Sequence, residues 1–154
     1  EYQNFEIDST EMLRIYDYAF TKGLIIMHHT GADHGMPPPY KSNPKKIAYV
    51  ADQLRGGIMI AAHLGSHNMW DDVERYLMGK NVYLDTSMGF EYYSEEQFLR
   101  IVKAHGADKI LFGSDSPWSN AKNEIDTISR LPIDQETKDM ILGNNAKRIL
   151  KINI

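Results

Sequence analysis

Short apolar runs alternate with amphipathic stretches along the whole chain. Helical spacing of the apolar residues predicts a helix over residues 10–22, three further helices between the apolar runs, and two closing helices near 120–130 and 134–150. Continuous apolar strands joined by helices are typical of a parallel sheet that is covered on its faces, so we expect an α/β fold. The apolar runs expected to form buried strands are 24–28, 58–62, 81–85 and 109–112.

Polar residues that can cap helices precede most of the predicted helices. Asp8, followed three residues later by an acid, resembles a capping box, and Ser94 has the same relation to a glutamine. Asn43 stands directly before a proline, which is a common start of a helix, and Asn68 is the expected cap of the third helix. Gly143 predicts a break in the last helix.

Imidazoles and carboxylates follow the predicted strands at the points where the apolar runs stop. In parallel α/β architectures these strand ends share one edge of the sheet, where ligands bind. Two imidazoles and a carboxylate are typical ligands of zinc and also suit manganese, iron or cobalt. A divalent ion lowers the pKa of bound water to about 7, and a nearby carboxylate can accept its proton. The residues in question are His28, His29, His63, Asp85 and Asp115.

These residues are not equally well placed to bind a metal. Adjacent residues of a strand point to opposite faces, so only one of His28 and His29 can face the strand-end cavity, and we favour His29 as the metal ligand. His28 is expected to pack against helices or to line the loop beside the substrate. Asp85 is interpreted as a structural acid at the end of its strand. Trp118 and Asp33 are candidate substrate-binding residues.

Composition limits the remaining possibilities. The chain has 154 residues, a net charge of −4 and no cysteine, which excludes disulfides and thiolate metal sites. We expect no nucleic-acid partner and no membrane span, and a small molecule as the substrate. The absence of cysteine suits a reducing cytoplasm, where we expect the protein to act.

Five segments together carry a resemblance to a known family: His-Thr-Gly-Ala-Asp at 29–33, Ala-His-Leu-Gly at 62–65, Asn-Val-Tyr-Leu-Asp-Thr at 81–86, Phe-Gly-Ser-Asp-Ser-Pro-Trp at 112–118 and Gly-Asn-Asn-Ala-Lys-Arg-Ile at 143–149. They resemble, in order, the second half of the amidohydrolase superfamily, in particular its amidohydrolase-2 type, which contains metal-dependent hydrolases and the aminocarboxymuconate-semialdehyde decarboxylase group. The resemblance implies that residues 1–154 are one partial domain, with the fifth to eighth strands of a (β/α)₈ barrel.

The resemblance also implies roles for three of the strand-end residues. His29 and Asp115 would bind a metal, His63 would bind a second metal or activate water, and Asp115 would carry a proton. The implied reaction is hydrolysis of an amide, ester or lactone by metal-activated water, with zinc as the first expectation and manganese, iron or cobalt as alternatives. Non-oxidative decarboxylation on the same metal platform is the alternative reaction.

One departure from the family pattern is large. No His-x-His pair occurs in the chain, whereas the family carries such a pair of ligands on its first strand. We therefore expect the N-terminal half of the barrel to be absent, so that this fragment alone is inactive. A separate N-terminal half or a second copy of the chain would then complete the barrel. A small α/β domain without catalytic activity remains the alternative from another functional class.

Overall fold

The computed structural model describes residues 4–54 and 56–152, which form a four-stranded parallel sheet with helical connections. This arrangement confirms the α/β prediction and corresponds to part of a TIM barrel. The helices are α1 (Thr10–Thr21), α2 (Pro44–Gln53), α3 (Trp70–Tyr76), α4 (Glu95–His105), α5 (Ala121–Arg130), α6 (Gln135–Asp139) and α7 (Asn145–Leu150). The strands are β1 (Ile25–His28), β2 (Ile58–Ala61), β3 (Tyr83–Asp85) and β4 (Ile110–Leu111).

The strands pair in chain order, β1-β2-β3-β4, so all four carboxyl ends lie at the same edge of the sheet. In the first pair, Ile25 lies opposite Ile58 and His28 lies opposite Ala61. The second pair places Ala61 opposite Leu84. Because the side-chain period of a strand is two residues, this register decides which side chains reach the common edge.

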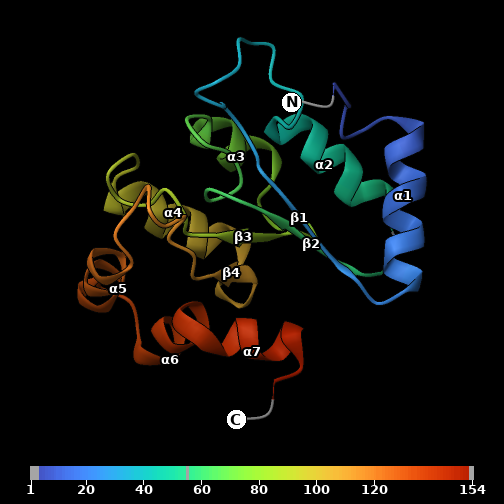
Figure 1. The fold of residues 1–154 in the computed structure, drawn as a ribbon. Coiled ribbons are helices and arrows are strands. Elements are labelled where there is room, and N and C mark those ends of the chain that lie inside the picture. Colours follow the sequence, from blue (N-terminus) through green and yellow to red (C-terminus); the bar gives the residue numbers. More distant parts are fainter. Residues whose placement is uncertain (1–3, 55, 153–154) are drawn as a thin grey trace.

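The two faces of the sheet contribute to different apolar clusters. Met59, Leu84 and Ile110 belong to the larger cluster, which includes buried side chains of α1 to α5. The alternate residues Ile60 and Leu111 pack with Ile149 of α7 in a smaller cluster. In Figure 1, α6 and α7, coloured red, lie below the strands. None of the helices in the described part of the chain is long and apolar enough to cross a membrane.

Two of the four predicted helix caps form, and two do not. Asn43 accepts a hydrogen bond from the backbone N–H of Lys46, and Ser94 caps α4 in the same way. The cap of α1 is Ser9 and not Asp8, because the Ser9 hydroxyl accepts from Met12 N at 3.3 Å. The predicted Asn68 cap is wrong.

Helix α3 begins one residue later than Asn68 would require, with Met69 at the cap position and no side-chain hydrogen bond. The backbone of Asn68 is left-handed, with φ of 56°, and its amide contacts the His67 ring. The break predicted at Gly143 is confirmed as a π-helical turn, Met140–Asn144, between α6 and α7.

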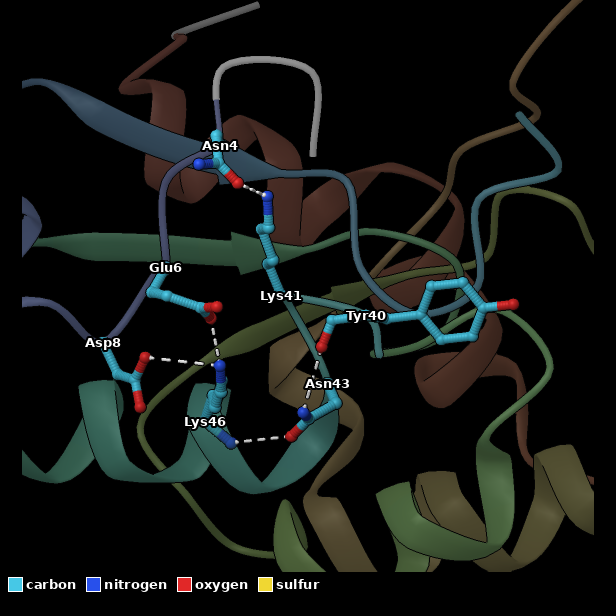
Figure 2. A network of polar contacts seen from close by, with 7 residues as sticks. All are labelled: Asn4, Glu6, Asp8, Tyr40, Lys41, Asn43 and Lys46. Atoms are coloured by element: carbon cyan, nitrogen blue, oxygen red, sulfur yellow. Dashed lines mark hydrogen bonds and ion pairs between the residues drawn. The ribbon is translucent and has the colours of Figure 1, made fainter. Parts of the chain in front are cut away.

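A network of polar contacts holds the segment before α1 onto the loop after β1. Lys46 of α2 forms an ion pair with Glu6 and lies 3.8 Å from Asp8, and Lys41 donates to Asn4 (Figure 2). Asn43 adds a hydrogen bond to the carbonyl of Tyr40 at 3.2 Å. These contacts hold the end of the loop, where it enters α2, against the segment before α1.

The loops after β1 and β2 cross at a point where a glycine is required. His67 N donates to Thr30 O at 2.8 Å, and Ala32 N donates to His67 O at 3.0 Å, so the two loops pair like a short extension of the sheet. Gly31 lies between these contacts with φ of 93°, and a Cβ there would lie 2.3 Å from His67 N. Only glycine allows this approach of one backbone to the other.

Replacement of Gly31 by alanine therefore tests the crossing. Gly31→Ala adds backbone strain and a collision with the His67 backbone, whereas Gly79→Ala adds strain alone, because Gly79 has φ of 72° and open space around its Cβ position. We expect Gly79→Ala to cost about 1–2 kcal/mol and Gly31→Ala a further ~1–3 kcal/mol in the free energy of unfolding. Urea unfolding measures both, and equal losses would contradict the close approach.

Candidate functional site

A cavity of about 440 Å³ opens at the carboxyl edge of the sheet. Loops that follow all four strands contribute to its wall, as expected for a ligand site in a parallel α/β fold. Its lining residues are His29, Ala32, Asp33 and His34 after β1, His63 and His67 after β2, Met88 and Tyr92 after β3, and Asp115 and Trp118 after β4.

Two imidazoles face each other in this cavity. His29 Nδ1 lies 3.0 Å from His63 Nε2, and the two rings meet edge to face with centroids 4.9 Å apart. His29 is exposed to the cavity, whereas His63 is buried, with 6% of its surface accessible. Burial is the main cause that lowers the pKa of His63, and the neighbouring His29 adds to the effect. His63 therefore favours the neutral form.

Left-handed backbone turns several side chains into the cavity. His63, Met88 and Asp115 have φ of 61°, 54° and 56°, and all three line the cavity wall. This conformation is uncommon for residues other than glycine and costs on the order of 1–3 kcal/mol each. This conformation occurs in three of the four loops that follow the strands, so the fold maintains strained backbone at this edge of the sheet.

The backbone of His63 is fixed by hydrogen bonds on both sides. Its N–H donates to Asp85 Oδ1 at 3.1 Å and approaches Ser87 Oγ at 3.2 Å. Its carbonyl accepts from Trp70 Nε1 at 3.0 Å. Ser87 Oγ also lies 2.9 Å from His63 Nδ1 and donates to Asp85 Oδ1. The sequence did not single out Ser87, although its position two residues after a strand-end aspartate was the available signal.

A second pair of imidazoles lies on the same wall. His67 Nε2 is 3.2 Å from His34 Nε2, and the Asn68 amide lies 3.2 Å from the same nitrogen. The His67 ring also meets the Tyr92 ring edge to face, with centroids 5.0 Å apart. His67 is almost completely buried, with 1% of its surface accessible. Neither His34 nor His67 was among the residues favoured from the sequence.

The predicted site residues divide into those that share the cavity and one that does not. Asp33, Asp115 and Trp118 line it together with His29 and His63, and Trp118 is 71% exposed at the rim. Asp33 also accepts a hydrogen bond from Gly35 N at 2.9 Å.

The substrate-binding role predicted for His28 is not supported, because His28 points to the other face of the strand. Its ring packs edge to face against Tyr16 of α1, with centroids 5.2 Å apart. This placement is the packing against helices that strand alternation also allowed.

The histidine pair suits a divalent ion, but the complete ligand set is not assembled. Two nitrogens bound to one tetrahedral zinc at about 2.0–2.1 Å lie roughly 3.3 Å apart, which is close to the observed 3.0 Å between His29 and His63. Within residues 4–54 and 56–152, no three His, Asp or Glu side chains come close enough together to hold an ion. Asp115 shares the cavity without joining the pair, so its role as a ligand stays a prediction.

Comparison with known proteins relates most of the chain to one family. The family model described as Amidohydrolase matches residues 3–152. No curated protein matches the chain.

Solved structures share the fold at low sequence identity. An uncharacterized TIM-barrel protein from Bordetella bronchiseptica has a TM-score of 0.75 and 22% identity, and the match covers 96% of this chain and 52% of that one. A dihydroxybenzoic acid decarboxylase from Polaromonas, with bound manganese and the inhibitor 2-nitroresorcinol, has a TM-score of 0.71 and 18% identity, with 97% and 56% covered.

An amidohydrolase from Burkholderia multivorans with bound zinc has a TM-score of 0.75 and 11% identity, and the match covers 96% of this chain and 59% of that one. The chain thus spans between half and three fifths of the length of these three structures.

The surroundings of His67 predict a lowered pKa for its ring. Burial, followed by the neighbouring imidazoles of His63, His34 and His29, lowers the pKa of His67 to about 4, and the Asp115 carboxylate only partly opposes this. An unfolded chain takes up this proton near pH ~6.5. The folded state therefore loses stability through this group as the pH falls from ~6.5 to about 4.

Nuclear magnetic resonance of the His67 ring measures this pKa directly. We expect a midpoint near 4, and His67→Gln should remove the corresponding part of the pH dependence of the free energy of unfolding. A midpoint close to the unperturbed value of ~6.5 would contradict the burial of this imidazole.

Proposed function

Because the chain belongs to the amidohydrolase family, we propose that it carries the site of a divalent-metal-dependent hydrolase that acts on an amide, ester or lactone. The observation that supports this most strongly is the pair of imidazole nitrogens, His29 Nδ1 and His63 Nε2, that meet 3.0 Å apart in a cavity also lined by Asp115. These are the residue types that hold zinc or manganese in proteins.

In this proposal His29 and His63 hold the ion, and Asp115 reaches it from the loop after β4. The ion, when bound, would polarise the carbonyl of the substrate and lower the pKa of water toward about 7. Zinc is the first choice for this ligand set, and manganese is the alternative, since structures that share the fold contain one or the other.

The residues of the chain supply orientation and proton transfer. Burial keeps His63 neutral, so its ring can accept a proton or a cation at neutral pH. Asp115 is exposed to the cavity, which suits a carboxylate that takes a proton from water and passes it to the leaving group. The hydrogen bond of 2.9 Å between Ser87 Oγ and His63 Nδ1 limits the movement of the ring during these steps.

The cavity walls indicate a small-molecule substrate with both an apolar and a polar part. Met88, Tyr92 and Trp118 provide an apolar and aromatic side, and Trp118 is exposed at the rim where it can cover a bound ring. Asp33 and His34 provide the polar side. A volume of about 440 Å³ lies in the range of small-molecule sites, which is about 300–1,000 Å³.

We also propose that further strand-helix units complete the barrel, either from an N-terminal half or from a second copy of the chain. A closed barrel of this type has about eight strands, and the sheet described here has four. The edge strand β1 supports this proposal, because Met27 is 60% exposed.

Substitution of the three proposed metal-holding residues tests the site. We expect His29→Ala, His63→Ala and Asp115→Asn to lower hydrolytic activity about 100-fold or more and to reduce the zinc or manganese retained after dialysis. Asp126→Asn is the matched control, because Asp126 is an exposed carboxylate paired with Lys122 on the surface of α5. Full metal content in all three variants would contradict the proposal.

The reaction type needs a separate test. Protein whose barrel is completed, by an N-terminal half or by a second copy of the chain, and that is loaded with zinc or manganese should release the acid from panels of amides, esters and lactones. Trp118→Ala should raise the KM of the best of these substrates. Non-oxidative decarboxylation, the alternative reaction, would instead release carbon dioxide from unsaturated or aromatic acids. Carbon dioxide release without hydrolysis would replace the hydrolase proposal with the decarboxylase.

A further inference from the structure

Three side chains behind the cavity form a connected chain of hydrogen bonds that ends at the His63 ring. Asp85 is the last residue of β3, Ser87 follows that strand, and His63 follows β2, so the contacts join neighbouring strands. All three residues are buried, with accessible fractions of 3%, 5% and 6%. Because these groups are largely shielded from water, the direction of each hydrogen bond among them can be worked out from the donors and acceptors present.

Asp85 Oδ1 is an acceptor whatever the protonation state of the other oxygen. It accepts from His63 N at 3.1 Å and from Ser87 N at 2.9 Å, and a backbone N–H can only donate. Ser87 Oγ lies within hydrogen-bond distance of the same oxygen. Two acceptors would repel each other at that separation, so the Ser87 hydroxyl proton must point to Asp85.

Because Ser87 donates its only hydroxyl proton to Asp85, the direction of the hydrogen bond between Ser87 and His63 is fixed as well. Ser87 Oγ lies 2.9 Å from His63 Nδ1 and can only accept there, because a hydroxyl has one proton. His63 Nδ1 must therefore carry the hydrogen. In a neutral imidazole the second nitrogen then has the free lone pair, and in His63 this is Nε2, the atom that faces His29 in the cavity.

We propose that Ser87 is a positioning residue for His63. Because Ser87 donates its hydroxyl proton to Asp85, it can only accept from His63 Nδ1, which holds the ring as its Nδ1–H tautomer. The Nε2 lone pair is then presented to the cavity. The use of that lone pair to bind a cation or take a proton rests on the proposed function; the tautomer itself does not. Histidine ligands in proteins are commonly oriented in this way by a hydrogen bond at the other ring nitrogen.

The wild-type protein without metal gives the most direct test. Nitrogen-15 resonance of the His63 ring at a pH of about 8, where neutral imidazoles prevail, should show a protonated Nδ1 and an unprotonated Nε2. A protonated Nε2 would overturn the proposal, and this outcome does not depend on whether the protein hydrolyses anything.

Variants at Ser87 separate positioning from general stability. Ser87→Ala removes the acceptor and should give a mixture of tautomers, whereas Ser87→Thr keeps a hydroxyl and should restore the Nδ1–H form. Ser129→Ala is the matched control, because its hydroxyl is exposed and donates to Ile125 O within α5. A pure Nδ1–H signal in Ser87→Ala would overturn the role of Ser87.

Metal affinity provides the second measurement and distinguishes the two proposals. We expect Ser87→Ala to weaken zinc binding about 10–100-fold with Ser129→Ala unchanged. If the wild-type protein binds no zinc but keeps the predicted tautomer, the proposed function fails and the positioning role of Ser87 stands. If zinc binds normally to Ser87→Ala while its tautomers are mixed, the hydrogen bond positions the ring without supporting the metal.

Discussion

The parallel register between β1 and β2 is the constraint on which the site depends. With His28 opposite Ala61, the chains that leave the two strands run side by side, and Ala62 N donates to His28 O at 3.0 Å. His29 and His63 are the residues that follow, so their rings meet at the edge of the sheet. A slip of one residue would send one of these rings to the other face of the sheet.

The backbone crossing at Gly31 and the side chains behind His63 both hold the imidazoles of the cavity wall in place. The crossing brings the loops after β1 and β2 into contact, which places His34 against His67. Asp85 and Ser87 then hold the N–H and the ring of His63 from the neighbouring strand. The cavity thus has one exposed side, with Asp115 and Trp118, and one buried side that is anchored in the sheet.

Much of the fold and part of the site could be predicted from local sequence. The four strands and the order of the helices follow from apolar spacing, and alternation within β1 separates His29 from His28 because it depends on one strand only. The contact of Ser87 with His63 could not be predicted, since it depends on the register that brings β3 beside β2. Asn68 was misassigned because its backbone is left-handed, unlike the extended backbone of a helix cap, and its amide contacts the ring of the adjacent His67.

The left-handed backbone at His63 and Asp115 also restricts how this protein could change over time. Glycine, asparagine, aspartate and histidine tolerate that conformation, whereas valine, isoleucine and threonine are strongly disfavoured. The geometry alone therefore disfavours β-branched replacements at these two positions, whereas unbranched side chains can adopt it, as Met88 does in the neighbouring loop. Any replacement of His63 or Asp115 has to meet this backbone requirement as well as any chemical one.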